Sequence, residues 1–168
     1  MTQEDLQECF PESELVFLPD RMFDDALVGI AVRKTTPVVP VYRYDDCRRA
    51  VALLDPLEAH ARLTSLFVHD IHPAPLILMP VHRQSFWENN KKGKIVVWDG
   101  AHDAIVGTGR RGLEPEVAVY AYPLMIKALQ RSMESSVSGF NSAEEFFEAY
   151  VLQTWLGPQT PYVLYPAQ

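Results

Sequence analysis

Asp25 and Asp103 are the residues of this sequence whose setting best suits chemistry. Each stands just before an apolar run that contains a Val-Gly pair. Two carboxylates brought together could hold a metal ion or divide general acid and base roles between them. Arg33 and Arg111 follow the aspartates at the same spacing, so the simpler, structural interpretation is that each aspartate caps a local turn or pairs with its arginine. We favour the structural role and keep all four residues as candidates for binding a ligand or partner.

Histidines supply a second set of candidates. His102 precedes Asp103 and could act with it as base and orienter, although the first half has no histidine at the matching position. His69, Asp70 and His72 could offer three ligands to a metal ion. Such short spacings are common without a metal. We therefore predict no metal site and keep these three residues as weak candidates.

Paired tyrosines could bind a ring-shaped ligand. Tyr42 and Tyr44, like Tyr120 and Tyr122, are two positions apart, which places each pair on one face of a strand. Tyr44 and Tyr122 are our candidate contacts. The alternative is that each pair forms the edge of a core, with its hydroxyls at water.

Familiar cofactor and nucleophile motifs are weak or missing. The Gly107-Thr-Gly109 segment lacks the third glycine of a dinucleotide loop, and no serine stands in a nucleophile-elbow pattern. Cys47 precedes two arginines, which could lower its pKa, but burial as a small apolar residue is the favoured interpretation. We expect no cofactor.

A tandem duplication must position these residues. At a constant offset of 78, residues 25–50 and 103–128 are identical at 11 of 26 positions, where chance would give roughly two. The segments 75–80 and 161–166 are also alike. The identical pairs are Asp25/Asp103, Ala26/Ala104, Val28/Val106, Gly29/Gly107, Arg33/Arg111, Pro37/Pro115, Val39/Val117, Val41/Val119, Tyr42/Tyr120, Tyr44/Tyr122 and Ala50/Ala128. The duplication predicts a pseudo-twofold axis and a shared groove between the repeats.

The pattern of apolar runs predicts an α+β fold in which two copies of a β-β-β-α-α-β unit pack as one compact body. If 26–33 were helical, the unit would be β-α-β-α-α-β. The expected strands are 14–18, 26–33, 38–44 and 76–79, then 94–98, 104–109, 116–122 and 162–165; the expected helices are 46–54, 57–70, 124–134 and 142–155. The expected organisation is a poorly ordered lead-in (1–12), unit one (13–80), a linker (81–93) and unit two (94–168) with a loop insertion at 132–141.

Three parts of the sequence resemble motifs of a family of small uncharacterised proteins associated with bacteriophages and their hosts. They are Phe23-Asp-Asp-Ala-Leu-Val-Gly29, Val41-Tyr-Arg-Tyr-Asp-Asp-Cys47, and the acidic helix that ends at Trp155-Leu-Gly157. Members usually carry one copy of the unit and have no established activity. The resemblance therefore implies a fold unit and no chemistry.

Composition narrows the function classes. The net charge of −7 and the lack of a basic stripe argue against nucleic acid as a partner. No secretion signal or apolar span is visible, so we expect a cytoplasmic protein with no membrane contact. Our first hypothesis is a non-catalytic module that binds a protein or small molecule between the repeats. The alternatives are a metal-dependent hydrolase using Asp25 and Asp103 with a nearby histidine, and a homo-oligomeric structural protein.

Overall fold

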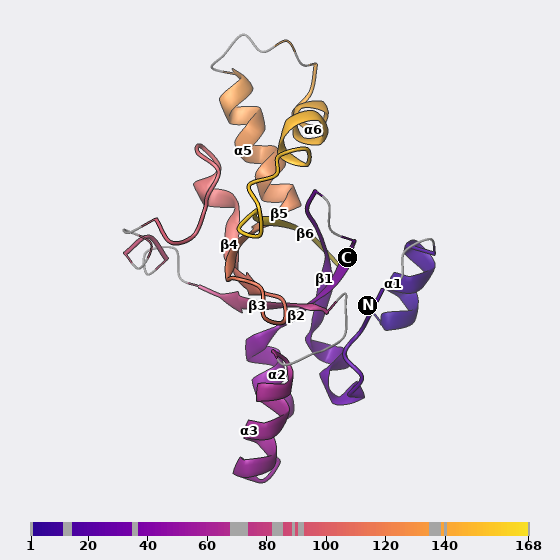
Figure 1. The fold of residues 1–168 in the computed structure, drawn as a ribbon. Helices are drawn as coiled ribbons and strands as arrows, with labels where there is room; N and C mark the ends of the chain where they lie inside the picture. The colour runs from indigo at the N-terminus through magenta and orange to yellow at the C-terminus, as the bar shows by residue number, and fades with distance from the viewer. Residues whose placement is uncertain are drawn as a thin grey trace.

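A closed six-stranded barrel forms the centre of the computed structural model, which is mixed α+β (Figure 1). The strands neighbour one another in chain order, and the last pairs with the first. They are β1 (Leu27–Val32), β2 (Val39–Arg43), β3 (Leu76–Pro80), β4 (Ile105–Arg110), β5 (Val117–Ala121) and β6 (Tyr162–Pro166). The structure describes residues 2–11, 15–34, 37–67, 74–81, 86–88, 90, 93–134, 139 and 141–167.

Strand pairing follows one pattern twice. β1 is antiparallel to β2, and β2 is parallel to β3; β4 is antiparallel to β5, and β5 is parallel to β6. Gly29 lies opposite Val41 in the first half, and Gly107 lies opposite Val119 in the second. Two antiparallel seams, β3–β4 and β6–β1, join the halves into one ring. Because a closed barrel leaves no unpaired edge, neither half can satisfy its strands alone.

The prediction of a first strand in each unit, at 14–18 and 94–98, is wrong. Residues 15–18 and 94–98 form no strand. The backbone N–H groups of Leu18 and Trp98 instead donate to tyrosine hydroxyls, at Tyr42 (3.2 Å) and Tyr120 (2.8 Å). Each segment is therefore held by hydrogen bonds to side chains, a tyrosine hydroxyl among them, rather than by a ladder. Within the segment 26–33, Leu27–Val32 form a strand and not the alternative helix. A 3₁₀ helix precedes this strand in each copy: η1 (Arg21–Ala26) and η2 (His102–Ala104).

Helices lie on opposite sides of the barrel (Figure 1). The first half contributes α2 (Tyr44–Ala50) and α3 (Pro56–Ser65); the second contributes α5 (Tyr122–Glu134), α6 (Ala143–Phe146) and a π-helical turn, η3 (Phe147–Val151). The helices α2 and α5 begin two residues before the predicted starts. At α2 this is because the chain passes directly from β2 into the helix, with Arg43 at the N-cap and no side-chain cap.

Part of the segment expected to be a poorly ordered lead-in is helical. A short helix, α1 (Gln3–Cys9), begins with a capping box between Thr2 and Asp5. These reciprocal hydrogen bonds satisfy two backbone donors at the start of the helix. Leu6 anchors the helix because its side chain is buried against the first half's core.

Side chains fill the barrel and cover it on both sides. The interior cluster is aliphatic apart from one tyrosine; two outer clusters lie under the helices of the two halves. The interior members are Ala31, Val39, Val41, Leu76, Leu78, Val117, Val119, Tyr162 and Leu164. Within the described part of the chain, no helix combines the length and apolar character needed to cross a membrane.

Candidate functional site

Both repeated arginines converge on one carboxylate at one end of the barrel. Arg33 follows β1 and donates through Nη2 to Glu114 Oε2 at 2.7 Å. Arg111 follows β4, and its Nη1 lies 3.6 Å from Glu114 Oε1. The two arginine side chains are 4% exposed and that of Glu114 is 28% exposed. We call Arg33, Arg111, Glu114 and Tyr162 the arginine cluster.

Other contacts fix both guanidinium groups. Arg33 donates to the carbonyl of Pro158 at 3.0 Å and lies over the Tyr162 ring, 4.3 Å from its centroid. Arg111 donates to the carbonyl of Ala74 at 2.9 Å and to the Tyr162 hydroxyl at 3.3 Å. Burial raises the pKa of Tyr162, and the two arginines oppose that rise. The cluster is thus a hydrogen-bonded closure of the barrel end, built by both halves.

This geometry corrects the predicted Asp–Arg pairs. Asp25 and Arg33 lie before and after β1, and a strand of that length separates them by about 20 Å. The same holds for Asp103 and Arg111 around β4. The repeated arginines therefore pair with Glu114, which three-residue spacing places beside Arg111.

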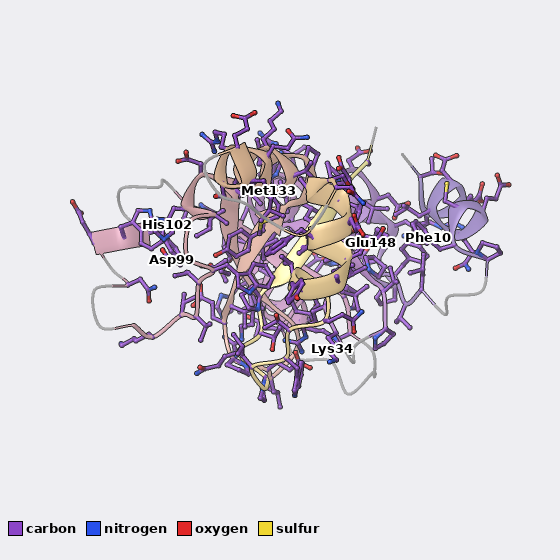
Figure 2. All side chains as sticks on the ribbon, turned by 90° about the horizontal axis from the view of Figure 1, so that it is seen from above. Phe10, Lys34, Asp99, His102, Met133 and Glu148 are labelled. Atoms are coloured by element: carbon purple, nitrogen blue, oxygen red, sulfur yellow. The ribbon has the colours of Figure 1, made fainter. Side chains whose placement is uncertain are left out.

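The structure does not bring Asp25 and Asp103 together. Both are exposed, and they precede strands that are not neighbours in the ring. Asp103 lies 3.5 Å from Arg131 of α5. His102 lies beside Asp99, with Nε2 3.9 Å from Oδ1 (Figure 2), and its ring is 4.6 Å from that of Trp87. Asp103 and His102, the predicted acid–base pair, thus contact Arg131 in one case and Asp99 and Trp87 in the other.

A groove runs along the β3–β4 seam, where the two halves meet. We call it the seam groove; its volume is about 530 Å³. Tyr44 and Phe67 come from the first half, and their ring centroids are 5.9 Å apart. The second half contributes Arg110 and the loop after β4. The lining residues are Tyr44, Phe67, Met79, Arg110, Leu113, Glu114, Pro115 and Glu116.

Arg110 is the cation of the seam groove. Its guanidinium carbon lies 5.4 Å from the centroid of the Phe67 ring, a distance that suits a cation–π contact. Within the described part of the chain, no carboxylate lies within ion-pair distance of this exposed side chain. Its planar fork of donors can therefore receive a carboxylate or phosphate.

The matching seam, β6–β1, is filled with apolar and aromatic side chains. Val32 stands where the other seam has Arg110, and Tyr165 stands where it has Met79. Tyr122, the second predicted aromatic candidate, stacks on Tyr165 with ring centroids 4.6 Å apart. Burial raises the pKa of the Tyr165 hydroxyl to about 12. Tyr44 and Tyr122 therefore have different surroundings despite their matching positions.

Tyr42, Tyr120 and Cys47 have structural roles. The Tyr42 and Tyr120 hydroxyls are buried hydrogen-bond acceptors, so the expectation that they face water is wrong. Burial raises the pKa of Tyr120 to about 12. Burial likewise raises the pKa of the Cys47 thiol to about 12, with Asp46 adding to the rise. The thiol is thus kept protonated despite the adjacent arginines.

Among the described residues, no cluster of three or more His, Cys, Asp or Glu side chains could hold a metal ion. The weak candidates His69, Asp70 and His72 lie outside the described residues.

Sequence reasoning missed Glu114, Arg110 and Phe67. A signal existed for Glu114, because two buried arginines need a carboxylate and Glu114 follows Arg111 by three positions. Arg110 aligns with Val32, so it marks a difference between the copies rather than a shared feature.

Comparisons of the chain with protein-family models, curated proteins and solved structures each found no match.

Proposed function

We propose that this protein is a non-catalytic binding module that holds an amphipathic anion in the seam groove. The ligand class is a carboxylate or phosphate attached to an apolar group. The observation that carries the proposal is the position of Arg110, exposed on the Phe67 ring in a groove built by both halves. Carboxylate or phosphate would pair with the guanidinium, and the apolar group would cover Met79, Tyr44 and Leu113.

The dimensions and composition of the groove support this proposal. Its volume falls within the usual range for small-molecule sites. Leu113 is 85% exposed beside it, a large apolar side chain that a ligand could cover. Glu114 does not oppose an anion strongly, because two guanidinium groups neutralise it. The carboxylate of Glu116 accepts from Thr108, which lines a separate hollow.

We also propose that the two halves are diverged copies of one unit related by a pseudo-twofold axis. The equal offsets of β1/β4 and β2/β5, and the matched registers of their pairs, support this. On this proposal one seam was filled by aromatic residues while the other kept an open groove. The protein then has one such binding site, the seam groove, although the repeat unit occurs twice.

The experiment is a calorimetric titration of wild type and Arg110→Gln with hexanoate and phenyl phosphate. Acetate and inorganic phosphate serve as probes without an apolar group. Arg131→Gln is the matched control, because Arg131 is an exposed arginine on α5, on the opposite side of the barrel from α2 (Figure 1). We expect saturable binding of the amphipathic anions to wild type and to the control, and at least tenfold weaker binding to Arg110→Gln.

Equal binding to wild type and Arg110→Gln would refute the site, and no binding of either amphipathic anion would refute the ligand class. A loss in the control as well would show a general charge effect. The hydrolase alternative stays a prediction, since no described contact joins Asp25 to Asp103. The family resemblance and a homo-oligomeric state also stay predictions.

A further inference from the structure

A second pocket lies beside the seam groove and belongs to the second half and the preceding segment. Its volume is about 510 Å³. Phe86 and Ile95 form part of its apolar wall, and Phe86 is buried. Thr108, Glu116 and Lys94 bring polar atoms to the same space. We call it the lateral pocket; it shares Pro115 and Glu116 with the seam groove.

A buried hydroxyl holds the carboxylate of the lateral pocket in place. Thr108 is 3% exposed, and its Oγ1 donates to Glu116 Oε1. Asn90, also in the lining, is fixed by two hydrogen bonds of 2.9 Å to the backbone of Ile95. The fold therefore already orients Glu116 and Asn90, which reduces the cost of ordering these two side chains when a ligand binds.

The corresponding place in the first half is an apolar core. Ile30 stands where the second half has Thr108, and Val38 stands where it has Glu116. Ile30 is 3% exposed in the first half's core, and Val38 packs against that core. Two aliphatic side chains thus correspond to a hydroxyl and a carboxylate. Because Glu116 is exposed while Val38 packs against the core, the second half keeps an open polar position where the first half is closed by aliphatic packing.

Two opposite charges line this pocket without forming an ion pair with each other. Within the described residues, Lys94 makes no ion pair, and the Glu116 carboxylate is bonded to Thr108 alone. A molecule with an ammonium and a carboxylate can satisfy both charges, and the wall around Phe86 and Ile95 requires it to carry an apolar group.

We propose that the lateral pocket binds a free apolar α-amino acid. The ammonium group pairs with Glu116, the carboxylate pairs with Lys94, and the side chain packs on Phe86 and Ile95. This site does not depend on the anion proposed for the seam groove.

The test is a calorimetric titration with L-leucine, L-methionine and L-phenylalanine. Phenethylamine and 3-phenylpropionate each lack one charge of phenylalanine. We expect saturable binding of at least one amino acid, and at least tenfold weaker binding of both singly charged analogues when that amino acid is phenylalanine. Glu116→Gln and Lys94→Gln should each weaken binding at least tenfold, because each removes a charge-assisted contact. Glu134→Gln, an exposed acid on α5, is the matched control.

A double variant separates binding from folding. Thr108→Ile with Glu116→Val copies the first half, so it should remain folded with an unchanged or higher melting temperature and bind no amino acid. Arg110→Gln should leave amino acid binding unchanged, which distinguishes this site from the seam groove. No saturable binding of any of the three amino acids to wild type would overturn the proposal, as would full binding by the double variant.

Discussion

Glu114 determines whether the two buried arginines are compensated. Its side chain reaches both guanidinium groups, while the predicted partners Asp25 and Asp103 lie beyond the other ends of β1 and β4. A buried cation that loses its carboxylate keeps the cost of desolvation and loses the compensating attraction. The carboxylate of Glu114 therefore matters more to folding than the two repeated acids.

We predict that Glu114→Gln destabilises the protein by about 3 kcal/mol, the low end for breaking a buried pair, because Glu114 is partly exposed. For a chain of this length the melting temperature should fall by roughly 6–12 °C. Asp25→Asn serves as the control, and we expect it to stay within about 0.5 kcal/mol of wild type. Calorimetric melting of both variants is the measurement. Equal melting temperatures for the two would contradict the role given to Glu114.

A second prediction at the level of single residues concerns the Tyr120 hydroxyl. Its hydroxyl accepts the backbone N–H of Trp98 at 2.8 Å, so Tyr120→Phe should leave that donor without its partner. The expected cost is about 1–3 kcal/mol. Because the Trp98 ring lies 4.8 Å from the Tyr120 ring, tryptophan fluorescence should change with it. An unchanged denaturation midpoint and spectrum would show that this hydrogen bond does not hold the segment.

At the scale of elements, two glycines set how closely the seams pack. A Cβ at Gly29 would overlap the carbonyl oxygen of Tyr165 in β6, and Gly29 has a positive φ of 148°. A Cβ at Gly107 would lie 2.6 Å from the carbonyl oxygen of Met79 in β3. Both positions cross a seam between the halves, so they control barrel closure.

We predict that Gly29→Ala and Gly107→Ala each destabilise the barrel by about 2–4 kcal/mol, through overlap with backbone and, at Gly29, through φ strain. Gly139→Ala is the matched control, since no heavy atom of the described residues lies within 4 Å of the added Cβ. Urea denaturation of the three variants measures the effect. A stable Gly107→Ala would mean that β3 and β4 can separate without loss.

The sequence predicted most strands and helices but not the ring. Bulky and β-branched residues identified β2 and β5, and the repeat identified the two as matching strands of the two copies. The runs 14–18 and 94–98 looked like strands because they are apolar, yet hydrogen bonds to Tyr42 and Tyr120 replace a ladder there. Local patterns carry no information on which strand closes on which. For the same reason Arg33 and Arg111 were identified as a pair, but Glu114 was not identified as their partner.

At the scale of the whole molecule, groups that are buried in their protonated form make the folded state less stable at high pH. Burial raises the pKa of Cys47 and of Tyr120 to about 12, from ordinary values of 9 and 10. Above these ordinary values the unfolded chain loses protons that the folded chain keeps. The folded state therefore binds more protons, and its stability falls as pH rises from about 9 towards 12.

We predict that the urea midpoint is level between pH 7 and 8.5 and falls steadily between pH 9 and 11. Tyr120→Phe should start from a lower midpoint and lose less over the same interval, because one titrating group is gone. Parallel slopes for variant and wild type above pH 10 would contradict the link between burial and alkaline unfolding.

The pairing of β6 with β1 bears on how the chain folds during synthesis. The first strand of the barrel must wait for the sixth, because Ile30 lies opposite Tyr165 across the closing seam. Residues leave the ribosome at about 5–20 per second, so the first half emerges with β1 exposed along one edge for several seconds. A nascent chain of this kind presents a bare strand to neighbouring copies on the same messenger RNA. Chaperone binding to the emerging first half would protect it until β6 arrives.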